Sequence, residues 1–182
     1  QRQMCIRDSL KPGELAATAG TSGVVFAVTD NKKTNESERI NNFLHAEIDN
    51  SNSLGKLLCI NGAGIQYAKL KNKLNIESYD EMNKLSIKVG VGSEELTYLP
   101  FGNGSERMLN NINVGSSMLN FDKNIHNNAH LIRATLEGIA FAFVYGIQLL
   151  INDGVRPSVI RAGNDNLFKS CLLYTSPSPR DY

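Results

Sequence analysis

Apolar residues follow two different spacings along this chain. Two apolar runs, ELAATA from Glu14 and GVVFAV from Gly23, flank the small residues of the turn at 20–23. Short apolar runs joined by a glycine-bounded turn are typical of a β-hairpin. Further runs predict strands at 56–60, at 95–101 with its end at Pro100, at 116–121 and at 157–163, whereas the polar segment 31–43 is expected to be a loop.

Other segments show helical spacing. The segment 61–76 opens with small residues and places three apolar side chains on one face, which predicts a helix. Ser78 with Glu81 three residues later resembles a capping box and predicts a short helix. The longest helix is expected at about 128–152, followed by another that opens near 164. Strands mixed with helices favour an α/β or α+β fold.

The long apolar helix could belong to a membrane or to a protein core. Its continuous apolar stretch at 138–151 is too short to span a bilayer, and Arg133, Glu137 and Gln148 interrupt the wider run. We therefore expect a buried core helix and no membrane partner.

The two ends of the sequence do not look like protein. Back-translation of MCIRDS at 4–9 and CLLYTS at 171–176 gives the same DNA read on opposite strands, as in a sequencing adapter. We therefore interpret residues 1–9 and 171–182 as adapter-derived and 10–170 as the natural domain. The remaining window is long enough for one domain with its own core.

Net charge and cysteine content exclude some classes of partner and of site. The net charge of +1 shows no excess of basic residues of the kind that binds nucleic acid, so we expect no nucleic-acid partner. Of the three cysteines, only Cys59 lies inside 10–170, which excludes a disulfide framework or a thiolate metal site there. A lone thiol in an apolar run fits a core position and a reducing cytoplasm.

Three turns of small residues are the candidate ligand sites. They lie at 20–23, at 61–64 and at 162–164, and the second and third precede predicted helices. Helix N-termini carry free N–H groups that suit phosphates, and glycine lets a ligand approach the backbone closely. Neither GxxxxGK[ST] nor GxGxxG is present, and any one such turn taken singly is more often only a turn.

Taken in order, the segments resemble the FGGY family of carbohydrate kinases, and xylulokinases in particular. The resemblance lies in AGTSGVVFAVTD, NGAGIQYAK, LPFGNGSERM, MLNFDKNIHNNAHLIRATLEGIAFAF and VIRAGNDNLF, which together cover nearly all of 10–170. It implies the second, C-terminal domain of such a kinase, with an actin-like, ribonuclease-H-like α/β fold that binds ATP.

The resemblance also implies roles for individual residues. Gly20, Thr21 and Ser22 match the turn that holds the β- and γ-phosphates of ATP, with Mg²⁺ bridging the phosphates. Gly62 and Gln66 match positions near the nucleotide, and Gly163 and Asn166 fall in the adenosine turn. The family's catalytic aspartate matches no residue of the chain and is expected upstream of the turn, and the sugar site is expected in an N-terminal domain.

The chain also departs from the family pattern. Asn120 stands where the family has glycine, and only Gly163 remains of the glycines in the adenosine turn. D-xylulose is the expected substrate, with gluconate, ribulose or fuculose kinases as alternatives within the family. A non-catalytic actin-like module that binds nucleotide is the alternative outside it, and a homodimer is compatible with either.

Several polar residues have structural interpretations beside functional ones. His126 and His130 are four residues apart and could share a helix face, yet no third metal ligand is evident, so we predict no metal site. Glu106 and Arg107 could be a cleft contact or a loop ion pair. Glu137 is expected to satisfy a buried backbone group or a neighbouring turn rather than act as a base.

Overall fold

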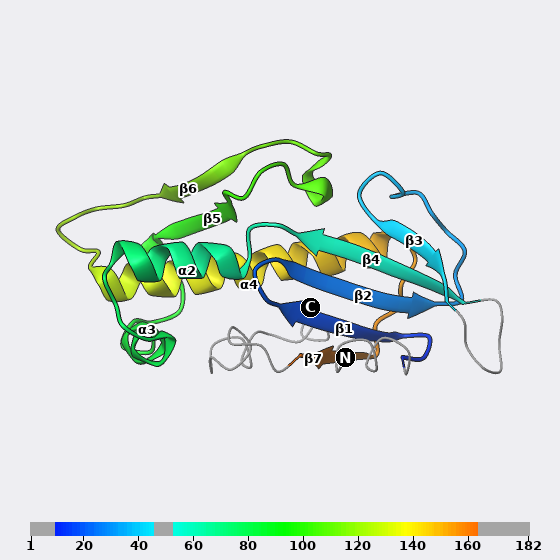
Figure 1. The fold of residues 1–182 in the computed structure, drawn as a ribbon, viewed down its shortest axis with the longest axis horizontal. Coiled ribbons are helices and arrows are strands. Elements are labelled where there is room, and N and C mark those ends of the chain that lie inside the picture. The colour runs from blue at the N-terminus through cyan, green and yellow to red at the C-terminus, as the bar shows by residue number, and fades with distance from the viewer. Residues whose placement is uncertain (1–9, 46–52, 164–182) are drawn as a thin grey trace.

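The computed structural model describes residues 10–45 and 53–163 (Figure 1). The predicted adapter segments 1–9 and 171–182, the helix predicted near 164 and Asn166 lie outside the described residues. The strands are β1 (Glu14–Ala19), β2 (Gly23–Thr29), β3 (Asn41–Leu44), β4 (Leu54–Ile60), β5 (Thr97–Phe101), β6 (Gly115–Leu119) and β7 (Val159–Ala162). The helices are α2 (Gly64–Lys73), α3 (Tyr79–Ser86) and α4 (Asn128–Asn152), with short 3-10 helices at Ser93–Glu95 and Arg107–Leu109.

A five-stranded mixed sheet, in the order β3-β4-β2-β1-β7, forms the centre of the fold. β1 and β2 are the antiparallel hairpin that the sequence predicts, with Ala19 opposite Gly23. β4 pairs antiparallel with β2, and β7 pairs parallel with β1 from the far end of the chain. Strands from distant parts of the sequence therefore lie side by side in one sheet.

The long helix α4 supplies most of the core. It runs behind the sheet and α2 in Figure 1 and contacts β2, β4, β5, α2 and α3. A Cβ on Gly23 would lie 2.6 Å from the Phe143 ring, and one on Gly146 would lie 2.7 Å from Leu58, so glycines let helix and strands approach closely. Because strand side chains alternate between faces, the other face carries a smaller apolar cluster around Phe26 and Val28.

By length and hydropathy, α4 could cross a membrane, and 61% of its most apolar window is buried inside the domain. This burial fits the core helix expected from the sequence. The apolar residues that α4 contributes to the main core pack against β1, β2 and β4 side chains; they are Ile132, Leu136, Ile139, Ala142, Phe143, Ile147, Leu149 and Leu150.

The second, two-stranded sheet of β5 and β6 lies over α2 and α4 (Figure 1). A Cβ on Gly138 of α4 would lie 2.0 Å from the backbone oxygen of Tyr98, so this hairpin rests directly on the helix. The predicted end of β5 at Pro100 is one residue short, because Pro100 pairs with Ser116 and Phe101 still pairs with Gly115. Since β5 pairs with β6 alone in the described chain, a residue without an N–H is tolerated there.

Capping side chains mark the N-terminal ends of α3 and α4. Ser78 accepts the N–H of Glu81 at 3.2 Å and begins α3, as predicted. Asn127 begins α4 by accepting the N–H of Ala129 at 2.9 Å, and His130 completes this capping box. The prediction of a loop over 31–43 is wrong at its end, where β3 adds an edge strand to β4.

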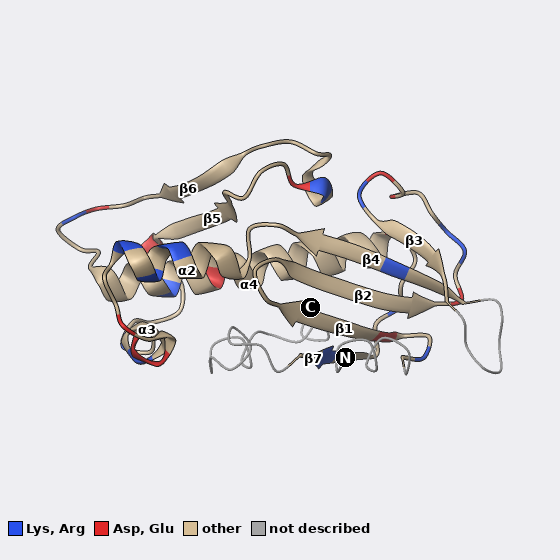
Figure 2. Ribbon diagram, in the orientation of Figure 1, with Lys and Arg blue, Asp and Glu red and all other residues tan. Residues whose placement is uncertain are grey.

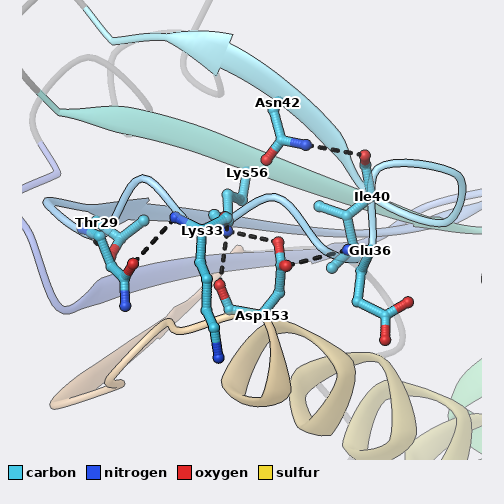
Figure 3. Close-up of polar contacts among 8 residues, drawn as sticks. Thr29, Lys33, Glu36, Ile40, Asn42, Lys56 and Asp153 are labelled. Carbon is cyan, nitrogen blue, oxygen red and sulfur yellow. Dashed lines mark hydrogen bonds and ion pairs between the residues drawn. The ribbon is translucent and has the colours of Figure 1, made fainter.

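Charge is distributed over helices and loops, and the sheet carries little of it (Figure 2). The basic residue on β4 is Lys56, whose side chain is completely buried. Figure 3 shows its ammonium group directed at Asp153, just after α4, and at the carbonyl of Lys33. Asp153 in turn accepts the N–H of Glu36 at 3.1 Å, which fixes the 33–36 loop against the end of α4.

Candidate functional site

The three small-residue turns meet at one edge of the sheet. β1 ends at Ala19 where the first turn begins, and the parallel strand β7 ends at the same edge. β4 runs antiparallel to β2, with Ile60 opposite Gly23, so the second turn also begins there. The topology thus brings together segments 20–23, 61–64 and 162–163, which are far apart in the sequence.

Backbone hydrogen bonds join the second turn to the first, and the third segment to β1. The N–H of Gly64 donates to the carbonyl oxygen of Gly20, and the N–H of Ile65 donates to that of Thr21. Both distances are 3.0 Å. The N–H of Gly163 donates to the Ala17 oxygen at 2.7 Å and extends the pairing of β7 with β1. The edge of the sheet is therefore one connected structure.

These bonds correct one expectation from the sequence. The first N–H groups of α2 are not free as predicted, because Gly64 and Ile65 donate to the first turn and Gln66 donates to Ala63. The N–H of Gly62 is also taken, by a carboxylate oxygen of Glu106 at 2.9 Å. The start of α2 supports the first turn instead of offering a separate anion site.

The first turn itself has free donors. Gly20 and Thr21 are exposed and Ser22 is half-buried. Within residues 10–45 and 53–163, the N–H groups of these three residues donate to no other group. Three successive backbone N–H groups with two neighbouring hydroxyl groups are donors of the kind that phosphate oxygens accept.

Gly62 has a packing reason to be glycine. A Cβ at this position would lie 1.7 Å from the backbone oxygen of Pro100 in β5. The β5–β6 hairpin therefore touches the backbone of the second turn, which leaves no room for a side chain. The structure places Gly62 beside the first turn, and its predicted contact with a nucleotide stays a prediction.

Gln66 lies on the face of α2 that is turned toward the β5–β6 hairpin. Its side chain is 2% exposed, and its Oε1 accepts the hydroxyl of Tyr98 at 3.0 Å. Its Nε2 is buried and has no partner among the described residues. A half-open groove of about 560 Å³ adjoins it, between α2, β6 and the start of α4, and Lys69 and Lys73 line the groove. A buried amide donor without a partner is costly, so this atom is a candidate contact for a ligand or water.

Glu106 and Arg107 have separate partners. Glu106 is completely buried and accepts the N–H groups of Asn61 and Gly62, each at 2.9 Å. Burial raises the pKa of its carboxyl group, and the two N–H donors partly oppose this rise. Arg107 instead reaches the 37–41 segment, where it donates to the carbonyl oxygens of Ser37 and Glu38. Glu106 therefore forms neither the cleft contact nor the loop ion pair that the sequence suggested, because its carboxylate binds the backbone of a neighbouring turn.

The histidines and Glu137 support the loops before α4. His126 accepts the Asp122 N–H at Nδ1, and its Nε2 lies 3.0 Å from the Glu94 oxygen, so both ring nitrogens have backbone partners. Glu137 is bonded to Arg133 at 2.5 Å and accepts the N–H of Gly92 at 3.2 Å. The latter contact is the neighbouring-turn role expected from the sequence.

The structure also describes Asn120, where the chain departs from the family pattern, and Cys59, which the sequence predicts to lie in the core. Asn120 adopts a left-handed conformation with a φ of 61°, a backbone conformation that also suits the glycine of the family pattern. Cys59 is half-buried on β4, and burial raises the pKa of its thiol. It is thus less buried than the core position expected, and it is not activated as a nucleophile.

Sequence comparison finds relatives among sugar kinases. The chain is 31% identical over 153 residues to a xylulose kinase of Haemophilus influenzae and 30% identical over 165 residues to a gluconokinase of Bacillus subtilis. The matched regions cover 84% and 85% of this chain but 30% and 31% of the two relatives, so the chain spans about a third of their length. No protein-family model matches the sequence.

Structure comparison finds the same group. The fold matches a crystal structure of xylulose kinase from Rhodospirillum rubrum with a TM-score of 0.78 and 19% sequence identity. The match covers 93% of this chain and 34% of that one. At this identity the match concerns the fold, and it confirms the predicted α/β, actin-like ATPase architecture. Over most of its length the chain is thus similar to carbohydrate kinases of the FGGY family, with xylulose kinases among these relatives.

Proposed function

We propose that this chain is the nucleotide-binding part of an ATP-dependent carbohydrate kinase, with residues 10–170 as its C-terminal domain. The observation that carries the proposal is the turn at 20–22, whose three N–H groups have no partner in the described chain and lie next to two hydroxyl groups. Phosphoryl transfer depends chiefly on positioning the phosphates and neutralising their charge. Backbone donors in a fixed turn supply both.

Three of the remaining predicted contacts, Gly62, Gly163 and Gln66, lie within the residues that the structure describes. Gly62 and Gly163 lie at the same edge of the sheet, and Gln66 offers an unpaired amide donor on the helix that follows. Asn166 completes the predicted set. In this proposal the turn holds the β- and γ-phosphates, and the segment after β7 contacts the adenosine.

Mg²⁺ fits the same site through the nucleotide. The hydroxyl oxygens of Thr21 and Ser22 are ligands of the kind that Mg²⁺ accepts, and the phosphates bring further oxygens. Bound Mg²⁺ would neutralise charge on the transferred phosphate. The chain's own residues orient the phosphates through the backbone of the turn.

D-Xylulose is the substrate that we infer for the complete enzyme, and gluconate is the alternative. The similarity to a xylulose kinase favours the first and that to a gluconokinase the second. The catalytic aspartate and the sugar site would come from the part of the protein that precedes this domain. An enzyme that uses ATP and a free sugar would act in the cytoplasm.

Nucleotide binding tests the proposal. Titration of the chain with Mg²⁺–ADP, followed by ¹H–¹⁵N NMR, should shift the amide signals of Gly20, Thr21 and Ser22 first. Thr21→Val should weaken binding several-fold, whereas Thr97→Val on β5 is the matched control with an exposed threonine away from the turn. Shifts that avoid the turn, or none at all, would contradict the proposal.

The sugar is tested on the complete gene product. ADP release with Mg²⁺–ATP should be fastest with D-xylulose, and a preference for D-gluconate would favour the alternative. Nucleotide binding without turnover of any sugar would indicate a non-catalytic actin-like module.

A further inference from the structure

We propose that Glu106 is a positioning residue that sets the orientation of the phosphate-binding turn without touching the nucleotide. The inference rests on the function proposed above and adds a residue from the loop after β5. A continuous series of hydrogen bonds runs from the Glu106 carboxylate, through the start of α2, to the peptide groups of Thr21 and Ser22.

The first step joins Glu106 to the second turn. Its two carboxylate oxygens accept the N–H groups of Asn61 and Gly62, each at 2.9 Å, and its side chain is completely buried. Two further contacts close the same junction: the Asn61 side chain donates to the Ser105 oxygen at 2.7 Å, and Asn103 donates to the Asn61 oxygen at 3.1 Å. The loop at 103–106 therefore holds the backbone that leads into α2.

The second step joins α2 to the first turn. With 61–62 fixed, the N–H groups of Gly64 and Ile65 reach the carbonyl oxygens of Gly20 and Thr21, both at 3.0 Å. The position of these carbonyls therefore depends on the start of α2, and the start of α2 depends on Glu106.

The third step follows from peptide geometry. A trans peptide is planar, and its N–H points opposite to its C=O. The carbonyls of Gly20 and Thr21 point toward α2, so the N–H groups of Thr21 and Ser22 point away from it. The bonds from α2 thereby aim two donors outward, to the exposed side of the turn.

Glu106 has no partner among the lysine or arginine side chains in the described chain, and both of its oxygens bind backbone N–H groups. A carboxylate suits this task because it offers acceptors to two adjacent N–H groups at once. A glutamine at the same place has one acceptor oxygen and would present an N–H₂ group to the other donor. Glu106→Gln is therefore a conservative variant with a defined partial defect.

Hydrogen exchange tests the series without any nucleotide. In Glu106→Gln, exchange at Gly64 and Ile65 should become at least several-fold faster, while exchange at the buried strand residues Val25 and Leu58 stays the same. Glu106→Ala should show a larger local effect. Glu77→Gln is the matched control, because Glu77 is exposed and lies beyond α2. Unchanged exchange at Gly64 and Ile65, or equally faster exchange at all four amides, would overturn the proposal.

Affinity for Mg²⁺–ADP provides the second readout. Glu106→Gln should weaken binding about tenfold and Glu106→Ala more, with Glu77→Gln unchanged. In the complete enzyme, the KM for ATP should rise while the KM for the sugar stays constant. If the unsubstituted chain binds nucleotide and Glu106→Gln binds it equally well, the positioning role is wrong. If the unsubstituted chain binds none, the proposed function fails, and hydrogen exchange alone decides whether Glu106 holds the turn.

Discussion

Lys56 and Asp153 form an ion pair that is completely excluded from solvent, with the lysine Nζ 2.5 Å from Oδ2 of the aspartate. The same ammonium group donates to the backbone oxygens of Asp153, at 2.8 Å, and of Lys33. Asp153 also accepts the Glu36 N–H (Figure 3). One buried pair thus joins β4, the end of α4 and the loop after β2.

Replacing only one partner of this pair should be strongly destabilising. Lys56→Met leaves an unpaired buried carboxylate, and such a change costs about 3–5 kcal/mol of unfolding free energy. Urea denaturation followed by circular dichroism measures the loss. The double variant Lys56→Met, Asp153→Leu removes both charges and should be clearly more stable than the single variant. A single variant as stable as the unsubstituted chain would show that the pair carries little stability.

Gly62→Ala should disrupt the junction between α2 and the β5–β6 hairpin. The added Cβ would lie 1.7 Å from a backbone oxygen, and a backbone atom cannot move aside like a flexible side chain. Overpacking of this kind costs about 1–3 kcal/mol or more. Gly90→Ala is the control, because its Cβ would meet nothing within 4 Å and Gly90 has no positive φ. Thermal unfolding of both variants provides the comparison, and equal melting temperatures would contradict the prediction.

Glu95→Gly should stabilise the protein. Ser93, Glu94 and Glu95 follow Gly92 in one left-handed turn, with φ values of 48°, 52° and 68°. This conformation costs about 1–2 kcal/mol for a residue with a Cβ and little for glycine. We expect a gain of about 1 kcal/mol in urea denaturation. Glu95→Ala removes the same carboxylate but keeps the Cβ, so a similar gain in that variant would assign the effect to charge instead of backbone strain.

Stability should depend on pH through Glu106. Burial raises the pKa of this carboxyl group above its usual 4.5, so the folded state holds the proton more tightly than the unfolded state. Its contribution is therefore fully present below pH 4.5 and is lost as the pH rises through the higher folded value. Glu106→Gln cannot titrate, and the difference in unfolding free energy between the two proteins should change across this interval. If the difference in unfolding free energy between the two proteins stays constant from pH 4 to pH 7, the raised pKa of Glu106 is contradicted.

The sequence was most informative where local signals and packing agree. The hairpin at 14–29, the Ser78 cap and α4 could all be predicted, because apolar spacing and turn residues specify them locally. β3 could not, since its residues Asn41 and Asn42 are polar and it forms an edge strand only by pairing with β4. The buried Lys56 gave no signal either, because its partner Asp153 is distant in the sequence.

The turns of the candidate site could be predicted from the sequence, but the hydrogen bonds between them could not. The three small-residue turns were identified from the sequence, and the topology brings the described parts of them together. Spacing alone could not show that Gly64 and Ile65 donate to the first turn, nor that Glu106 accepts from the second. Both contacts join segments that are distant in the sequence, so only tertiary packing brings the partners together.

The parallel pairing of β7 with β1 has a consequence for the order of assembly. Gly13 and Ser158, which join these strands, are 145 residues apart, whereas the first two turns lie within about 45 residues of each other. Closing a long loop carries the larger entropic cost, and a chain made on the ribosome presents its N-terminal segments first. The Gly20 and Gly62 turns can therefore come together early in synthesis, while Gly163 must wait for the last strand to dock. The candidate site would therefore be completed late, by segments that are far apart in the sequence.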